Sequence, residues 1–402
     1  MTDLYQEWLK LDSEIQTWWD GDLHTAQEED IRNDPQKTLL FLPFPYSSAG
    51  GSESAFPEMY GWDTFFINLG MLAHKRPELV RNHILNHLSM IERFGMVLNG
   101  NRAYYFTRSQ PPLLAESVYR YGNYSLDQDI LAKAYPLLKK EYEDYWNAPH
   151  HATLIGLSTN RDLGDRGLRP ELSSEAETGL DFTACFEGDI RQCVPLLTNC
   201  ALIRYAYSLA WIADNLGWRE VSERWKREAE RRSELIRTYC WNDEEGFFFE
   251  YNYVRREQIK VWTLCAYWTL WANVATPDQA RRIADHLPKF EQEHGLSFTP
   301  EIYPSPHPEF SWLQWGYPSG WPPMHIIACE GLDRAGYTED AKRIAGKFLN
   351  LKIRIHKETG HLWEKYNVAE GNLQFPHERY DVPPFHGWSS AAFAVLGRLL
   401  FP

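Results

Sequence analysis

The sequence predicts an all-α protein built as an (α/α)6 toroid, in which six helical hairpins stand in a circle. About twelve segments place apolar residues at helical spacing, and almost none shows the alternation of a strand. The helices come in pairs, often one apolar and one amphipathic, as expected for an inner ring of buried helices and an outer ring of half-exposed ones. An irregular helical array is the alternative; the absence of a repeated consensus argues against a solenoid.

The predicted helices follow one another along the whole chain, beginning with a segment that has Leu4, Trp8, Leu11, Ile15 and Trp18 at helical spacing. Their ranges are 3–20, 63–74, 77–94, 113–121, 126–146, 190–215, 218–239, 258–274, 277–287, 324–335, 338–355 and 388–400. The long segments between them lack periodicity and contain Gly and Pro, and a loop as long as 150–181 is usually functional. No linker divides the chain, so we expect a single domain over residues 1–402.

Composition excludes several classes of partner. The 402 residues include 41 Lys and Arg against 55 Asp and Glu, a net charge of −14 that argues against nucleic acid or an anionic membrane. Six cysteines without a C-x-x-C pair read as reduced core residues of a cytoplasmic protein. Neither a signal peptide nor an apolar run long enough to span a membrane is expected. The oligomeric state stays open.

Aromatic residues point to a carbohydrate. They make up 15% of the chain, with 17 Trp, which favours an aromatic-lined cavity, although a Trp-rich core is the alternative. The stretch 56–66, FPEMYGWDTFF, sets Asp63 among aromatic rings. Burying an unpaired carboxylate costs several kcal/mol, so a core helix would not normally carry one there. A sugar site needs flat rings and a carboxylate for vicinal hydroxyls; the alternative is a solvent-facing Asp at a helix start.

Two further stretches carry polar groups outside regular structure. Residues 99–112, NGNRAYYFTRSQPP, offer Asn99, Arg108 and Gln110, and an arginine fork can bind sugar hydroxyls or a carboxylate. A structural Asn-Gly turn with surface arginines is the alternative. Residues 168–182, LRPELSSEAETGLDF, crowd four carboxylates into a Gly-containing segment. Close carboxylates raise one another's pKa, as a general acid requires at neutral pH; a solvated acidic loop is the alternative.

The last two stretches suggest an aromatic wall for a sugar site and a second carboxylate for the reaction. Residues 314–325, QWGYPSGWPPMH, hold Trp315 and Trp321 on a backbone that Gly and Pro make rigid. Residues 377–388, HERYDVPPFHGW, contain Glu378 between histidines that lack the i, i+4 spacing of a helical zinc site, so we expect no metal and no other cofactor. Without a phosphate loop or a G-x-S-x-G elbow, the economical mechanism is a pair of carboxylates flanking a glycosidic bond.

These stretches, in this order, resemble the trehalase family (glycoside hydrolase family 37) over roughly residues 48–392. FPEMYGWDTFF is similar to the end of its first signature and QWGYPSGWPP to its second, Q-W-D-x-P-x-G-W-x-P. NGNRAYYFTRSQPP is close to N-G-N-R-x-Y-Y-x-x-R-S-Q-P-P, and ETGLDF to the E-S-G-W-D-F segment of the general acid. HERYDVPPFHGW matches the segment of the general base more loosely. The resemblance implies an (α/α)6 toroid and inverting, exo-acting hydrolysis of a small α-glucoside.

The resemblance also implies roles for residues. Asp181 matches the general acid and Glu378 the general base, and inversion would place the two carboxyl groups roughly 6.5–9.5 Å apart. The other candidates, matched to the family or placed beside a match, are expected to bind substrate. They are Phe56, Tyr60, Trp62, Asp63, Asn99, Arg108, Gln110, Arg169, Glu171, Gly179, Gln314, Trp315, Trp321 and Trp388.

Departures from the family pattern leave the substrate open. The P-G-G-R-F of the family reads AGGSESAF here, the Asp of Q-W-D is Gly316, and the Arg of D-F-S-S-R-W falls at Cys185. The pattern resembles a relative with a different leaving group, such as the glucosylglycerate and mannosylglycerate hydrolases of family 63. A sugar-binding protein without catalysis and a zinc-dependent cyclase or transferase on the same toroid are the remaining alternatives.

Overall fold

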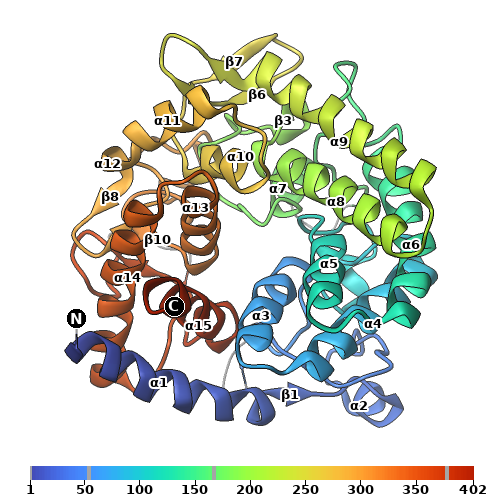
Figure 1. Ribbon diagram of the computed structural model, residues 1–402, viewed down its shortest axis with the longest axis horizontal. Helices are drawn as coiled ribbons and strands as arrows, with labels where there is room; N and C mark the ends of the chain where they lie inside the picture. Colours follow the sequence, from blue (N-terminus) through green and yellow to red (C-terminus); the bar gives the residue numbers. More distant parts are fainter. Residues whose placement is uncertain (1, 52–55, 165–168, 376–379) are drawn as a thin grey trace.

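The computed structural model describes residues 2–51, 56–164, 169–375 and 380–402. Six inner helices form a closed ring, because each contacts the next and the last contacts the first (Figure 1). In ring order they are α3 (Gly61–Ala73), α5 (Leu114–Ser125), α8 (Leu196–Asn215), α10 (Trp268–Trp271), α13 (Pro322–Arg334) and α15 (His386–Leu400). The predicted (α/α)6 toroid is confirmed.

An outer helix accompanies each inner one (Figure 1). The outer helices are α1 (Thr2–Gly21), α4 (Pro77–Phe94), α6 (Gln128–Glu141), α9 (Arg219–Cys240), α11 (Pro277–Asp285) and α14 (Thr338–Thr359). The pair α8 and α9 shows why the rings separate. Most of α8 is buried, whereas α9 buries a stripe that includes Trp225, Ala229, Ile236 and Cys240. Apart from the buried Arg232, its charged residues lie outside this stripe.

The two ends of the chain make the sixth pair. Helix α1 contacts both α14 and α15, and the Trp8 indole donates a hydrogen bond to the carbonyl of Phe393 at 3.3 Å. Asp12 accepts hydrogen bonds from Arg398 at 2.9 and 3.0 Å and lies 2.9 Å from His74, the residue that caps the end of α3. Although burial opposes ionisation, these two partners hold the pKa of Asp12 below its ordinary value. A buried ion cluster thus closes the ring.

The remaining elements are short. The helical ones are α2 (Glu28–Asn33), α7 (Pro170–Ala176), α12 (Leu287–Phe290), 3-10 turns at Ala103–Tyr105, Ile190–Gln192 and Leu264–Tyr267, and a π turn at Tyr142–Trp146. The strands are β1 (Leu23–His24), β2 (Tyr46–Ser47), β3 (Cys193–Val194), β4 (Trp241–Asn242), β5 (Phe247–Phe248), β6 (Glu250–Asn252), β7 (Glu257–Ile259), β8 (Glu291–Gln292), β9 (Gly295–Leu296), β10 (Ser319–Gly320) and β11 (Tyr366–Asn367). All their pairings are antiparallel, in the order β1-β2, β10-β11, β3-β6-β7, β4-β5 and β8-β9.

One predicted helix was wrong. The range 258–274 contains strand β7, a 3-10 turn and only the four residues of α10. Residues 257–259 pair with β6 instead, and the Thr263 side chain caps the 3-10 turn by accepting from the Cys265 amide. Conversely, α7 lies inside a range predicted as loop, where Pro170 supplies the fixed φ of a first helical position. No helix in the described ranges combines the length and apolarity that a bilayer crossing requires.

A buried carboxyl next to α8 allows a prediction about stability. Glu250 in β6 is fully buried and accepts a hydrogen bond from the amide of Leu196 at 2.6 Å, at the first turn of α8. Burial raises the pKa of Glu250 to about 8, so the folded protein keeps this proton at neutral pH while the unfolded chain loses it. Between the unfolded pKa and about 8, stability therefore falls by up to about 1.4 kcal/mol per pH unit from this group.

We expect Glu250→Gln to remove that dependence, because the amide oxygen keeps the hydrogen bond and cannot ionise. Urea unfolding at pH 5 and pH 8 should show the free energy of unfolding of the variant gaining on the wild type as pH rises. The matched control is Glu244→Gln, an exposed glutamate in the turn between β4 and β5. Parallel pH profiles for wild type and Glu250→Gln would contradict the assignment.

Candidate active site

A cavity of about 490 Å³ lies where the inner helices α3, α13 and α15 begin. Trp62 and Asp63 come from the first turn of α3, Trp321 precedes α13 and Trp388 lies in the first turn of α15. The other lining residues are Phe56, Tyr60, Asn99, Tyr105, Arg108, Gln110, Leu172, Ala176, Gly179, Asp181, Phe182, Gln314, Trp315, Glu364, Tyr380 and Phe385. A cavity of this size suits a small ligand.

Four tryptophans form one wall of the cavity. The rings of Trp315 and Trp321 stack with centroids 3.9 Å apart and an interplanar angle of 11°. Trp62 contacts Trp315 and Trp388 at centroid distances of 5.7 and 5.9 Å, and Trp321 contacts Trp388 at 6.0 Å. Each ring fixes its neighbours, so the wall is rigid before a ligand arrives. Indole faces of this kind suit the C–H face of a sugar ring.

Gly179 is explained by the same wall. Its φ of 75° lies in the left-handed region, and a Cβ added there would come within 2.7 Å of the Trp62 indole. Only glycine lets the segment that leads to Asp181 pass this close to Trp62. The glycine therefore joins the tryptophan wall to the carboxylate-bearing loop.

Asp63 is a buried carboxyl in the cavity, not a solvent-facing helix cap. Its exposed fraction is 4%, and the N-cap of α3 is Tyr60, three residues earlier. Burial, with a smaller contribution from the charge of Glu364, raises the pKa of Asp63 to about 8. Among the described residues, no cationic side chain forms an ion pair with Asp63. The fold thus keeps a carboxyl whose burial is energetically unfavourable, and this carboxyl lines the cavity.

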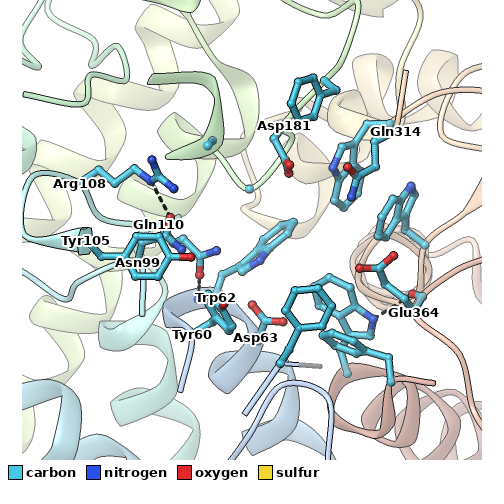
Figure 2. A pocket seen from close by; sticks show the side chains of 18 of the residues that line it. Tyr60, Trp62, Asp63, Asn99, Tyr105, Arg108, Gln110, Asp181, Gln314 and Glu364 are labelled. Atoms are coloured by element: carbon cyan, nitrogen blue, oxygen red, sulfur yellow. Dashed lines mark hydrogen bonds between the residues drawn. The ribbon is translucent and has the colours of Figure 1, made fainter. Parts of the chain in front are cut away.

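The segment 99–110 supplies the opposite wall. The Arg108 guanidinium donates to Asn99 at 2.7 Å and to Asp162 at 3.2 Å, and it lies over the Tyr105 ring at 5.1 Å. The side-chain oxygen of Gln110 accepts from the Trp62 amide at 3.1 Å, at the start of α3. These contacts leave polar edges of the segment facing the cavity (Figure 2).

Glu177 anchors the acidic segment from behind. Its carboxylate accepts from His151 at 2.8 Å, Asn160 at 3.1 Å, the amide of Arg161 at 2.9 Å and the hydroxyl of Tyr145. Although burial opposes ionisation, this set of partners lowers the pKa of Glu177. The ionised Glu177 therefore holds the loops around 109 and 160 against the segment that carries Asp181.

Glu364 lines the cavity and was missed by the sequence analysis. The Gln314 amide donates to the Tyr380 hydroxyl at 2.8 Å, which donates in turn to Glu364 at 2.8 Å. Asp63, Asp181 and Glu364 enter the cavity from three sides (Figure 2). A signal was present in the stretch 363–366, WEKY, because a charged pair between aromatic residues is the pattern that drew attention to Asp63.

Most of the predicted site residues lie together around this one cavity. The predicted residues that line the cavity are Phe56, Tyr60, Trp62, Asp63, Asn99, Arg108, Gln110, Gly179, Asp181, Gln314, Trp315, Trp321 and Trp388. Glu378 lies outside the described residues, so its role as the base stays a prediction. Within the described residues, no three His, Cys, Asp or Glu side chains are arranged to hold a metal ion.

Arg169 and Glu171 are not among the residues that line the cavity. Arg169 pairs with Glu171 at 3.1 Å and Glu309 at 2.7 Å, and it contacts His307 at 2.8 Å. In this arrangement the guanidinium ties the start of α7 to the loop at 305–313. Substrate binding by these two residues stays a prediction, whereas their contact with that loop is observed.

The comparisons with known proteins agree with this geometry. The family model described as Trehalase matches residues 3–176 and 158–396. The cytosolic neutral trehalase of Saccharomyces cerevisiae is 30% identical over 415 residues, covering 87% of this chain and 55% of that protein. The one of Emericella nidulans is 31% identical over 419 residues, covering 87% and 55%. The chain thus spans about half the length of these relatives.

Solved structures show the same architecture. Neutral trehalase from Saccharomyces cerevisiae superposes with a TM-score of 0.77 at 27% identity, covering 89% of this chain and 74% of that chain. The GH63 mannosylglycerate hydrolase from Thermus thermophilus, in complex with glucose, gives a TM-score of 0.65 at 17% identity and coverages of 87% and 95%; at that identity the likeness concerns the fold alone. From its sequence motifs, its cavity and the family match, this chain belongs to the trehalase family.

Proposed function

We propose that this protein is an inverting, exo-acting α-glycoside hydrolase that releases glucose or a related hexose from a small α-glycoside. The observation that carries the proposal is the cavity itself, in which three carboxyl-bearing residues face four tryptophans at one end of the toroid. Aromatic faces and carboxylates are what a pyranose and its hydrolysis require. Membership of the trehalase family supports the same reaction.

The first sugar occupies the part of the cavity between Asp63 and the tryptophans. There the Asp63 carboxyl binds vicinal hydroxyls, while Trp62, Trp315 and Trp321 cover the apolar face of the ring. Asp181 is the general acid that protonates the glycosidic oxygen, and Glu378 is the general base that takes a proton from the attacking water. Because the acid serves the leaving group, the aglycone lies on the side of Asp181 and Phe182.

A second candidate for the base is Glu364. It lines the cavity, and its hydrogen bond from Tyr380 fixes the carboxyl that faces the site. Glu378 is the preferred candidate for the base because it matches the family position. Variants of Glu378 and Glu364 distinguish the two candidates.

The substrate is expected to be a small α-glycoside other than trehalose, and trehalose is expected to be turned over more slowly than this substrate. Gly316 stands where the family pattern has Asp, so this chain lacks the carboxyl that the pattern carries at that position. The arginine of P-G-G-R-F also has no evident counterpart in the sequence. A leaving group such as glycerate would use different contacts from a second glucose.

The test is incubation with trehalose, glucosylglycerate, mannosylglycerate, kojibiose and maltose, with the anomer of the product followed by proton NMR. We expect the β-sugar as the first product and faster turnover of at least one other compound than of trehalose. Inverting hydrolysis of trehalose releases one β- and one α-glucose, because the leaving glucose keeps its configuration, so the anomer is read on the glycerate glycosides. The α-anomer as the first product from a glycerate glycoside would contradict inversion, and trehalose as the best substrate would contradict the expected preference. Sugar binding without hydrolysis of any compound would indicate a non-catalytic relative.

A further inference from the structure

Two glutamates of the acidic segment, Glu175 and Glu177, differ sharply in their surroundings. Glu177 has a set of hydrogen-bond donors and a lowered pKa, as described above. Glu175 is equally buried, with an exposed fraction of 1%, but no cationic side chain of the described residues pairs with it. Burial raises the pKa of Glu175 to about 8, and the charge of Asp181 contributes to that rise. Glu175 is therefore neutral at pH 7, and the mechanism above does not use it.

The contacts of Glu175 are with the backbone that carries Asp181. One carboxyl oxygen of Glu175 accepts a hydrogen bond from the amide of Thr183 at 3.1 Å, and the amide of Phe182 also donates to the carboxyl. The carbonyl of Glu175 accepts from the Thr178 amide at 2.9 Å and from the Thr178 hydroxyl. The Thr178 hydroxyl in turn accepts from the Leu180 amide at 3.0 Å. The turn from 175 to 183 is thus closed on itself around Asp181.

This turn holds an unfavourable backbone conformation. Phe182, directly after Asp181, has φ = 62°, in the left-handed region that aromatic residues rarely adopt. Such a residue persists only where the surrounding contacts fix it. The carbonyl of Phe182 accepts from the amide of Gln314 at 2.9 Å, so one side of the peptide is held by the tryptophan-bearing segment. Glu175 holds the other side.

We propose that Glu175 is a positioning residue for Asp181: its buried carboxyl holds the amides of Phe182 and Thr183 and so aims Asp181 at the leaving-group oxygen. The inference rests on the proposed function of Asp181 as general acid. The role needs a hydrogen-bond acceptor at this place and no negative charge, because the side chain is neutral at pH 7.

The test compares the turnover of two substrates by the wild type and by Glu175 variants at pH 7. An α-glucoside with an alcohol leaving group needs protonation by Asp181, whereas α-D-glucosyl fluoride releases fluoride with little need of an acid. For Glu175→Ala we expect kcat on the glucoside to fall about 10- to 100-fold with KM nearly unchanged, because a displaced general acid is costly. Turnover of the fluoride should stay within about threefold of the wild type.

Glu175→Gln provides the conservative variant. Its amide oxygen can accept the same backbone hydrogen bonds, so kcat on the glucoside should return to within about threefold of the wild type. Ser173→Ala is the matched control, since this buried serine lies on the same helix and its hydroxyl donates to the carbonyl of Pro170. If Glu175→Ala does not fold, Glu175→Asp withdraws the carboxyl by one methylene and serves the same comparison.

Several results would overturn the proposal. An equal loss on glucoside and fluoride would show a merely structural role, and no loss on either would show that Asp181 does not depend on Glu175. Failure of Glu175→Gln to restore the glucoside reaction would show that more than an acceptor is needed. A wild-type protein inactive on both substrates would instead overturn the proposed function, and the role of Glu175 with it.

Discussion

Asp63→Ala is expected to lower kcat/KM by about 10³-fold or more on every substrate that the protein accepts, because a buried polar site loses its anchor for the sugar hydroxyls. Asp63 stays buried in the cavity although burial raises its pKa to about 8, so the fold tolerates an unfavourable environment for this carboxyl. Hydroxyl groups of a bound sugar would supply the missing hydrogen-bond partners. The measurement is steady-state kinetics on the substrate found by the panel, together with thermal unfolding.

The folding control uses the same variant. Removing a buried carboxyl that resists ionisation should leave the melting temperature at pH 8 equal to or above that of the wild type. The activity loss would then come from the site and not from unfolding. Near-normal turnover of Asp63→Ala on every accepted substrate would show that the carboxyl has no part in binding or catalysis.

The second large effect concerns the pair of catalytic carboxyls. Asp181→Asn should lower kcat on an α-glucoside by about 10²- to 10⁴-fold, the usual contribution of a general acid, and should spare α-D-glucosyl fluoride to a large extent. Loss of the base should abolish turnover of both substrates, because the attacking water must be activated in either case. The two variants therefore give opposite patterns on the fluoride.

The base itself is identified by comparing Glu378→Gln with Glu364→Gln. Azide can replace water without needing a base, so the variant of the true base should form the β-glycosyl azide when azide is added to the fluoride reaction. We expect this rescue for Glu378→Gln and not for Glu364→Gln. Rescue of Glu364→Gln alone would move the base to Glu364, and a trapped glycosyl-enzyme would contradict an inverting mechanism altogether.

Hydrophobic periodicity was sufficient to predict most of the helices, because an inner helix must be apolar on nearly all sides and an outer one on a single stripe. Helix α8 and helix α9 show the two patterns in adjacent segments. Periodicity gave a wrong helix over 258–274, where pairing with β6 and the cap at Thr263 limit α10 to four residues. Local pattern cannot register a strand partner that lies elsewhere in the chain.

By itself, the sequence determined which residue types could serve a sugar site: Asp63 among aromatic rings, the two tryptophans around Gly316, and the glycine before Asp181. These are local features, since a carboxylate inside an apolar stretch or a glycine at a turn leaves its mark on a few adjacent residues. The family resemblance added the roles, and the pairing of apolar with amphipathic helices predicted the ring.

Only the tertiary structure decided which of these residues share a cavity. It brought Glu364 to face Asp63 and Asp181, and it tied Arg169 to Glu309 beside the loop at 305–313, outside the cavity lining. It also distinguished Glu175 from Glu177, two glutamates that look alike in sequence but are neutral and ionised in the folded chain. The reason is physical: burial and the partners that shift a pKa come from segments distant in the sequence, and only the closed ring of helices sets their distances.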